Sequence, residues 1–358
     1  TPLGDYAPLI YVFVLVSGTR QLCQQFVRGC GYVKLYAFDG ILATATTLLF
    51  NLLFLGPFNW GVYGYVIAII ASDACSIIFL FIGAKLWKNV TFKRLPSNAR
   101  KEMLKYSFPM VPSIILWWIT NVSDRYMVTY FVGASENGLY TAASKIPNFV
   151  ILFSTVFIDA WQLSAVDEYD SDSREAFFTK VFRVSSALIF FCRIITKILV
   201  DDSYFNSWKF VPVLIIATSF SCLVNFLASV YMAEKKSFMG MVTALSGAIT
   251  NIVLNFVLIP IMGATGAAVA TVVSFVVVFV FRGFNTHKYV KIDFKLPVLI
   301  SETVIIVAQC AIMIVMESGV VMYALEAVLC VLMLLFNFKQ IKELASLLLS
   351  KFFHKKAD

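Results

Sequence analysis

The most constraining feature of this sequence is a series of long apolar segments that fills almost the whole chain. About eleven segments hold roughly 20 or more mostly apolar residues, the length that a helix needs to cross a bilayer. Hydrophobic residues make up 60% of the 358 residues and charged residues 14%, whereas soluble domains carry about 25% charge. The sequence therefore predicts an integral membrane protein. The segments lie near residues 6–28, 33–55, 61–86, 103–131, 135–163, 175–200, 206–233, 236–259, 263–286, 293–316 and 319–337.

These segments predict helices rather than the strands of a membrane barrel. Barrel strands span about 10 residues and alternate between polar and apolar side chains. The apolar runs here are about twice that length and do not alternate, and a helix pairs its own backbone groups within lipid. We expect an all-α membrane protein with about eleven transmembrane helices.

The distribution of Lys and Arg predicts the orientation in the membrane. Most of the 29 basic residues fall in alternate connections and in the tail after residue 338, whereas the loops between them contain no Lys or Arg. Because cytoplasmic loops are the ones enriched in Lys and Arg, we expect a multi-pass protein of the cell (plasma) membrane with a cytoplasmic C-terminus. The net charge of +8 is then explained without a nucleic-acid partner. The loops without Lys or Arg cover residues 56–61, 133–138, 201–207, 260–266 and 316–319.

The seven cysteines predict neither a disulfide framework nor a metal site. No two of them form a CxxC pair, and all lie in or beside apolar stretches, where cysteine behaves as a small apolar side chain. We expect no metal and no cofactor.

An internal repeat relates the first three predicted helices to three later ones. The pattern G-x-x-G-x-x-x-A-x-x-x-S begins at Gly61 and again at Gly263, and each copy follows an apolar stretch that contains one asparagine, Asn51 or Asn255. Small residues are common where membrane helices pack, but four matched positions in the same helix order indicate a repeat. Both copies run in the same direction, as in the parallel repeats of several transporters.

The repeat predicts a two-lobed organisation. Three helices, from about 103 to 200, precede the second copy and have no counterpart before residue 6, so we expect that roughly 100 N-terminal residues and about three helices are missing. The expected parts are a partial N-terminal lobe, a cytoplasmic linker, a six-helix C-terminal lobe, two extra helices and a basic cytoplasmic tail. Their bounds are residues 1–90, 91–102, 103–290, 291–338 and 339–358.

Charged residues inside the predicted helices are the candidate site. Ionisable groups are costly within a bilayer and usually face a cavity or a partner. Arg20, Arg125 and Lys145 lie too deep to reach water easily, and a cationic pocket suits a phosphate or pyrophosphate. Asp124 is grouped with them; alternatively, it neutralises Arg125 or Lys145 and only locks two helices. Further carboxylates could serve ion coupling, and these are Asp39, Asp73 and Asp159.

A membrane-embedded glycosyltransferase or polymerase is an alternative of another class. Asp170 and Asp172 form a D-x-D pattern, which in glycosyltransferases holds a metal and a nucleotide sugar. This pattern lies in an acidic stretch between two membrane segments, with no strand–helix alternation around it, so a solvated loop is the preferred interpretation. We expect no enzyme.

Four stretches of the sequence resemble the polysaccharide-biosynthesis flippases, the Wzx-like branch of the multidrug/oligosaccharidyl-lipid/polysaccharide (MOP) exporter superfamily. The motifs SDRY, from Ser123, and AWQLSA, from Ala160, are the most specific parts of the resemblance. It covers nearly the whole chain. The stretches run from Tyr106 to Phe149, Ala160 to Tyr169, Ser207 to Val224 and Gly247 to Ser274.

The resemblance implies a MATE-like fold of about fourteen helices in two lobes around a cavity, of which this chain begins near the fourth. It implies translocation of undecaprenyl-pyrophosphate-linked oligosaccharide from the inner to the outer leaflet, with Arg125, and then Lys145 and Arg20, at the lipid-linked phosphates. Expected partners are this lipid-linked oligosaccharide, membrane lipids and polysaccharide-assembly proteins. A cation-coupled drug antiporter of the same superfamily is the alternative, although its cavity would favour acidic side chains over fixed cations.

Overall fold

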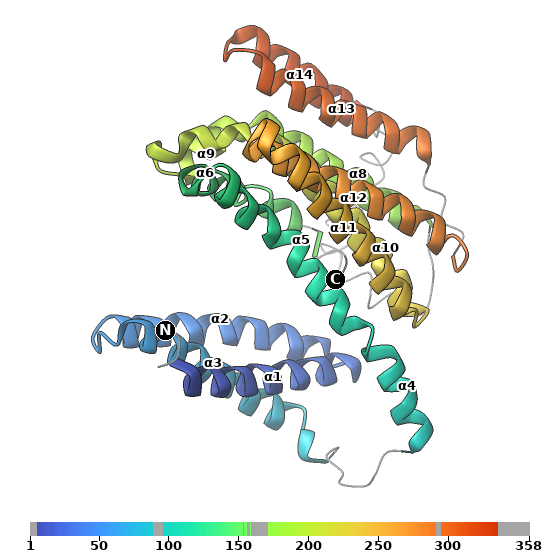
Figure 1. Cartoon of the computed structure of the whole chain (residues 1–358). Helices are drawn as coiled ribbons and strands as arrows, with labels where there is room; N and C mark the ends of the chain where they lie inside the picture. Colours follow the sequence, from blue (N-terminus) through green and yellow to red (C-terminus); the bar gives the residue numbers. More distant parts are fainter. Residues whose placement is uncertain are drawn as a thin grey trace, which may run out of the picture. The chain divides into compact units, whose positions relative to one another are not determined.

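The structure of the chain, a computed structural model, is helical throughout the residues that it describes (Figure 1). It divides into two compact units, residues 1–95 and 96–358, and each unit has its own cluster of buried apolar side chains. The boundary falls inside the linker expected at 91–102. The described residues are 6–88, 96–152, 154–155, 158, 171–290 and 295–335, with side chains left undescribed for 171–176.

The first unit contains three long helices, α1 (Ala7–Gly29), α2 (Val33–Leu55) and α3 (Gly61–Gly83), followed by the short 3₁₀ helix η2 (Leu86–Lys88). Their bounds agree closely with the first three predicted segments. Both α1 and α2 pack mainly against α3 rather than against each other. The polar side chains of α3 can therefore meet those of both neighbours.

The second unit begins with a helix pair that the sequence predicted as one segment. Helix α4 (Ser97–Ser107) ends before Pro109, and α5 (Met110–Phe131) begins directly after it. Proline has no backbone N–H to donate and is disfavoured inside a helix, which explains the break. The predicted span 103–131 is thus corrected to two helices, and α4 is polar enough to lie outside the apolar span.

Two further predicted segments also divide into shorter helices. The segment near 135–163 begins with α6 (Ala134–Ala143) and turns at residues 144–147, next to Pro147. The segment near 175–200 consists of α8 (Ser171–Phe190) and α9 (Cys192–Leu199).

The core of the second unit is built around three long helices. They are α10 (Val211–Ala233), α11 (Ser237–Met262) and α12 (Ala264–Thr286), and a 3₁₀ helix, η3 (Asp202–Lys209), leads into the first. Helix α12 packs against both α10 and α11, while α5 lies along α11. This packing brings polar residues of α5, α11 and α12 to one place.

A C-terminal helix pair, α13 (Leu296–Val315) and α14 (Val320–Leu335), completes the described part of the second unit. The two helices pack against each other and against α8. The tail expected at 339–358 lies outside the described residues, so its position on the cytoplasmic side stays a prediction.

The internal repeat is visible in the backbone and in the burial of its matched residues. Gly61 and Gly263 both have positive φ, 54° and 62°, at the start of α3 and α12. A residue with a Cβ adopts this conformation with difficulty, which accounts for glycine at both positions. The next three matched positions are buried in each copy: Gly64, Ala68 and Ser72, and Gly266, Ala270 and Ser274.

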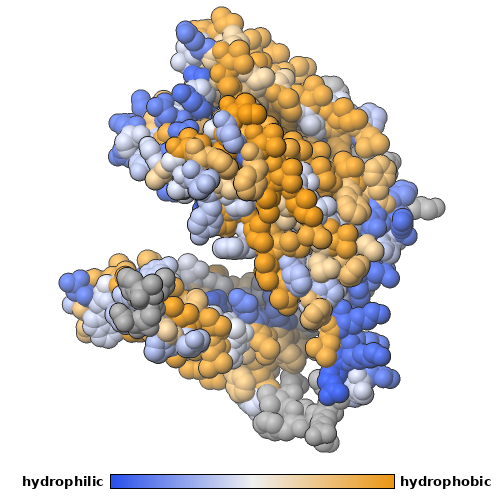
Figure 2. All heavy atoms as spheres, in the orientation of Figure 1, coloured by the Kyte–Doolittle hydropathy of each residue, from blue (hydrophilic) through white to orange (hydrophobic). Residues whose placement is uncertain are grey.

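The helices carry the apolar surface expected of a membrane protein. Six described helices are long and apolar enough to cross a membrane: α2, α3, α10, α11, α12 and α13. Apolar side chains cover much of the visible surface of the second unit, whereas polar ones gather over α4 (Figure 2). Along α11 an exposed apolar face contains Leu245, Ile249, Val253 and Phe256.

Candidate functional site

A buried carboxylate, Asp124 of α5, lies at the centre of a polar cluster in the second unit. Its side chain is 4% exposed and accepts three hydrogen bonds. The donors are Asn255 Nδ2 at 2.6 Å, Thr271 Oγ1 at 2.5 Å and the Tyr140 hydroxyl at 3.1 Å. Because α11, α12 and α6 each supply one neutral donor, the negative charge of Asp124 is held by hydrogen bonds alone.

A second row of amide groups extends this cluster along α11. Asn251 lies one turn before Asn255, and its Oδ1 accepts from both Asn255 Nδ2 at 3.0 Å and Ser123 Oγ at 2.8 Å. Both asparagines are fully buried, and Asn255 Oδ1 has no hydrogen-bond partner among the described residues. A buried acceptor without a donor is unfavourable; here it lies beside a carboxylate and could accept from a bound proton donor or face a cation.

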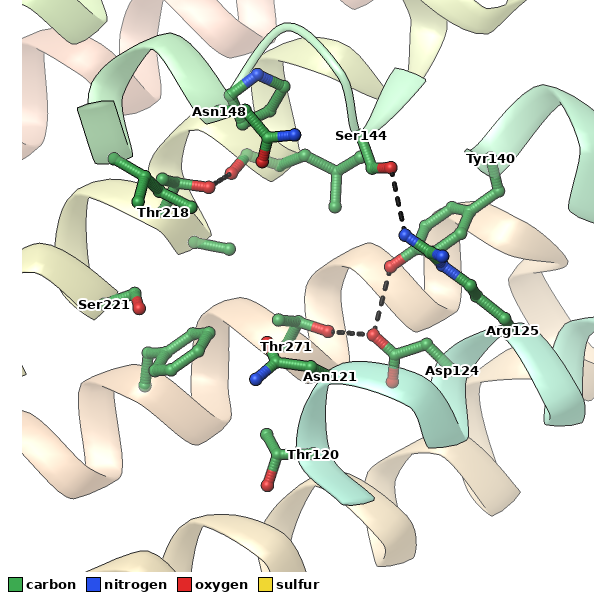
Figure 3. A pocket seen from close by; sticks show the side chains of 15 residues that line it. Thr120, Asn121, Asp124, Arg125, Tyr140, Ser144, Asn148, Thr218, Ser221 and Thr271 are labelled. Carbon is green, nitrogen blue, oxygen red and sulfur yellow. Dashed lines mark hydrogen bonds between the residues drawn. The ribbon is translucent and has the colours of Figure 1, made fainter. Parts of the chain in front are cut away.

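A cavity of about 190 Å³ lies next to Asp124. Its walls come from α5, α6 and the turn after it, α10 and α12, so α6 and α12, which donate to Asp124, also shape the cavity. Figure 3 shows polar side chains from these elements facing one another across it. The polar lining residues are Thr120, Asn121, Asp124, Arg125, Tyr140, Ser144, Asn148, Thr218, Ser221 and Thr271.

Arg125 lines this cavity and keeps most of its donors available. Its side chain is exposed, and the guanidinium makes one long hydrogen bond, from Nη2 to Ser144 Oγ at 3.3 Å (Figure 3). Lys145 follows Ser144 in the chain and is also exposed. Arg125 thus binds the serine that precedes Lys145 in the chain, whereas Lys145 is not among the residues that line the cavity.

The alternative in which Asp124 neutralises Arg125 or Lys145 is not what the described residues show. No ion pair joins Asp124 to either cation within the described ranges, where the two ion pairs both involve Arg20. Asp124 nevertheless links helices, but through Asn255, Thr271 and Tyr140. Arg125 is left with a single neutral partner in the described structure.

The other predicted cation, Arg20, lies in the first unit and is held by two carboxylates. Its Nη1 lies 2.8 Å from Asp73 Oδ1, and its Nη2 lies 3.7 Å from Asp39 Oδ2. Asp39 and Asp73 are 0% and 4% exposed. The structure therefore brings together Arg20, Asp39 and Asp73, with a formal charge of −1, and this differs from a free cationic site.

Neutral side chains complete the cluster around Arg20. Ser76 Oγ accepts from Arg20 Nε at 3.0 Å and donates to Asp39 Oδ1. Ser17 donates to Asp73, and Gln24 Nε2 donates to Asp39 Oδ2 at 2.6 Å. Because α1, α2 and α3 all contribute, this network joins the three helices of the first unit.

Some predicted residues lie outside the described part of the chain. These are Asp159, the specific AWQLSA motif, and Asp170; the side chain of Asp172 is also undescribed. The ion-coupling prediction for Asp159 and the sugar-transfer alternative for Asp170 and Asp172 thus remain predictions.

The burial of Arg282, near the end of the predicted segment 263–286, could not be read from the sequence. Arg282 is 2% exposed, donates to Thr243 Oγ1 at 3.0 Å and to the Val224 carbonyl at 2.7 Å, and lies 5.4 Å from the ring centre of Trp117. No ion pair with a carboxylate occurs at Arg282 in the described ranges. Arg282 lies only four residues before the end of α12, so only its packing reveals that it is buried.

Trp117 connects Arg282 to the cavity. Its ring stacks on Phe275 at a centroid distance of 5.9 Å, and Phe275 lines the cavity wall. An Arg over an aromatic face is stabilised by the charge distribution of the ring. The two aromatic rings therefore lie between a buried cation and the cavity.

Comparison with known proteins supports the family suggested by the sequence. Residues 5–161 match the family described as "Polysaccharide biosynthesis protein". No curated protein matches the chain significantly.

Solved structures share the fold at low sequence identity. A multidrug resistance MATE family transporter, in an outward-facing conformation, aligns with a TM-score of 0.65 and 11% identity, covering 79% of this chain and 69% of that one. The lipid II flippase MurJ, in an inward closed conformation, aligns with a TM-score of 0.57 and 14% identity, covering 94% of this chain and 72% of that one. A MOP superfamily transporter from Pyrococcus furiosus is described as having a binding pocket of reversed polarity. It aligns with a TM-score of 0.64 and 12% identity, covering 79% of this chain and 69% of that one.

The chain therefore shares the fold of these MOP superfamily structures, and the match of residues 5–161 to a polysaccharide-biosynthesis family agrees with the resemblance seen in the sequence. The apolar helices and this fold indicate a multi-pass membrane protein.

Proposed function

We propose, from the MOP transporter fold and the polysaccharide-biosynthesis match, that this chain belongs to a flippase for an oligosaccharide linked to a polyprenyl pyrophosphate. The observation that supports this substrate most is the exposed guanidinium of Arg125, which lies beside a polar cavity. In the described structure its hydrogen-bond partner is one neutral hydroxyl group. A doubly charged pyrophosphate requires positive charge within the membrane, where charge is costly without a partner. The match of the N-terminal part to a polysaccharide family favours a glycan as the cargo.

In this proposal Arg125 binds the head group through two parallel hydrogen bonds. A planar guanidinium fits two phosphate oxygens at once, which a lysine ammonium cannot reproduce. Arg125 needs to give up only a 3.3 Å hydrogen bond to Ser144 to do so. Lys145, the next residue after Ser144 in the chain, is proposed to add a second positive charge.

Asp124 is proposed to tune the cavity and to take part in ion coupling. It contributes a fixed negative charge next to Arg125. The hydrogen bonds that its carboxylate accepts from neutral donors could break when a proton or a cation binds to the carboxylate. A carboxylate buried among hydroxyl and amide groups has the oxygen ligands that a hard cation prefers. Binding of such an ion would change the interactions of α5, α6, α11 and α12 together.

Arg20, in the first unit, is less suited than Arg125 to bind a phosphate. Two buried carboxylates already hold its guanidinium, so phosphate binding would have to break one of these pairs. The same pairing makes Asp39 and Asp73 a second candidate for ion coupling, because a proton on either carboxylate would remove part of the attraction for Arg20.

The experiment that tests the proposal compares Arg125→Ala, Arg125→Lys and the control Arg100→Ala. Arg100 is an exposed arginine of α4 outside the cavity. Each variant is expressed in cells that depend on this protein for surface glycan, and glycan export is measured together with the amount of protein in the membrane. We expect a loss of export for Arg125→Ala, partial export for Arg125→Lys and normal export for Arg100→Ala.

Normal export by a stably inserted Arg125→Ala protein would refute the head-group role. Protection of the same cells against cationic drugs, with glycan export unaffected by every variant, would favour the drug antiporter instead. Loss of metal-dependent sugar transfer after changes at Asp170 and Asp172 would favour the enzyme.

A further inference from the structure

The C-terminal helix pair contains a buried acid that is separate from the proposed transport site. Glu326 of α14 and Gln309 of α13 are both 0% exposed, and Gln309 Nε2 donates to Glu326 Oε2 at 3.0 Å. Helix α8 packs against both α13 and α14. A carboxyl group here is removed from both water and lipid.

Two oxygen atoms of this pair lack hydrogen-bond partners. Glu326 Oε1 and Gln309 Oε1 are both buried, and neither accepts a hydrogen bond from any described residue. Unpartnered buried acceptors are rare and call for an explanation. Their occurrence on two side chains that already share one hydrogen bond indicates that a hydrogen atom lies between them.

A proton on Glu326 accounts for both oxygens at once. A protonated carboxyl group has one O–H donor, and Oε1–H of Glu326 could donate to Oε1 of Gln309 while Gln309 Nε2 donates to Glu326 Oε2. The acid and the amide would then form two reciprocal hydrogen bonds. In the other orientation of the Gln309 amide, its oxygen would face Glu326 Oε2 and would need the same proton.

The surroundings of Glu326 contain few groups that would stabilise its ionised carboxylate. Cys310 of α13 and Cys192 of α9 are the titratable groups that interact with it electrostatically, and both are thiols. Arg193, next to Cys192, donates instead to the Met313 and Met316 carbonyls and lies 3.9 Å from the Trp208 ring centre. No ion pair involves Glu326 in the described part of the chain.

A second buried acid of this helix junction, Glu302, has different surroundings from those of Glu326. Glu302 of α13 is 1% exposed and interacts electrostatically with Arg183 of α8. Glu302 therefore lies near a cation, whereas Glu326 makes no ion pair in the described part of the chain. The same three-helix junction therefore contains one acid beside a cation and one acid beside an amide and thiols.

We propose that Glu326 is a proton-binding site that holds its proton at neutral pH and joins α13 to α14 as a neutral acid–amide pair. Removal of the proton at alkaline pH would place an unpaired charge in the junction of α8, α13 and α14 and loosen it. This inference does not depend on the proposed cargo.

Infrared spectroscopy of the purified protein in lipid nanodiscs tests the proposal. A protonated carboxyl group has a carbonyl stretch at higher frequency than the amide bands, and carbon-13 labelling of the glutamate carboxyl separates it from any aspartate signal. At neutral pH we expect a labelled band in the wild type that is lost in Glu326→Gln. The matched control, Glu302→Gln, should retain the band.

The wild-type protein alone keeps the proposal testable if a variant does not fold. Absence of a labelled protonated-carboxyl band in the wild type at neutral pH would overturn it, as would persistence of the band in Glu326→Gln. As a second measurement, the unfolding temperature of the wild type should fall at alkaline pH more steeply than that of Glu326→Gln, which cannot ionise. Equal pH dependence would contradict the role of the proton in holding the helices.

Discussion

Asn255 donates its side-chain amide to Asp124 over 2.6 Å, although 131 positions separate the two residues in the chain. This contact joins α11 to α5 in the interior of the second unit. It also places the matched asparagine of the internal repeat next to the carboxylate of the SDRY motif. Asn255, from the internal repeat, and Asp124, from the SDRY motif, thus meet at one site.

Replacement of Asp124 should destabilise the second unit. Asp124→Ala leaves Asn255, Thr271 and Tyr140 without their acceptor, and each buried donor without a partner costs roughly 1–3 kcal/mol. Asp124→Asn keeps one acceptor oxygen and should be less harmful. Thermal unfolding of the purified protein in detergent would measure this order, and equal stability of Asp124→Ala and wild type would show that the cluster contributes little.

The ion pairs of Arg20 should be strongly coupled to each other. Arg20→Gln removes the cation from two buried carboxylates, and loss of one partner from a buried pair costs about 3–5 kcal/mol. The 23% exposure of the Arg20 side chain should reduce this cost. A second change, Asp73→Asn, should restore part of the stability, and a double-mutant cycle of unfolding measurements would quantify it. Additive effects would contradict direct pairing.

The repeat glycine Gly266 should not tolerate a side chain. A Cβ at this position would lie 2.3 Å from the backbone oxygen of Leu258, so Gly266→Ala should force α11 and α12 apart. Gly240 of α11 is the matched control, because a Cβ there would meet nothing within 4 Å. Gly240→Ala should be neutral or stabilise the helix by roughly 0.5–1 kcal/mol. The yield and unfolding temperature of the two variants provide the comparison, and similar behaviour would argue against close packing at Gly266.

Cysteine accessibility should report the predicted orientation. Cys30 is exposed between α1 and α2, whereas Cys23, Cys192, Cys222 and Cys310 are buried. Because the basic residues predict that this connection is cytoplasmic, a membrane-impermeant maleimide should label Cys30 in inside-out vesicles and leave it unlabelled in right-side-out vesicles. Mass spectrometry of the labelled peptides gives the result. Labelling in right-side-out vesicles alone would reverse the predicted orientation.

Much of the helix pattern could be predicted from the sequence. The bounds of α1, α2, α3, α11 and α12 follow the predicted apolar segments to within a few residues, because length and hydropathy are local properties. The segments with proline or mixed polarity were predicted less well. The break at Pro109 divided one predicted span into α4 and α5, although the proline was a visible signal.

The sequence singled out candidate residues but not their partners. Arg20, Asp124 and Arg125 stood out because charges are rare in apolar segments. Their pairing was not predictable: Asp73 and Asp39 hold Arg20, while Asn255 and Thr271 hold Asp124. Arg282 shows the converse, since nothing in the sequence distinguishes this buried cation from an exposed one near a helix end.

The sequence by itself determined that this protein is helical, that it lies in a membrane, and that small residues recur at matched positions, since each property depends on neighbours along the chain. Tertiary structure decided which polar groups meet. Helix packing brings Asp124 to Asn255 and Gln309 to Glu326, and it leaves Arg125 beside the cavity. A charged residue in lipid must find a partner, but packing decides whether that partner is an ion, an amide or a proton.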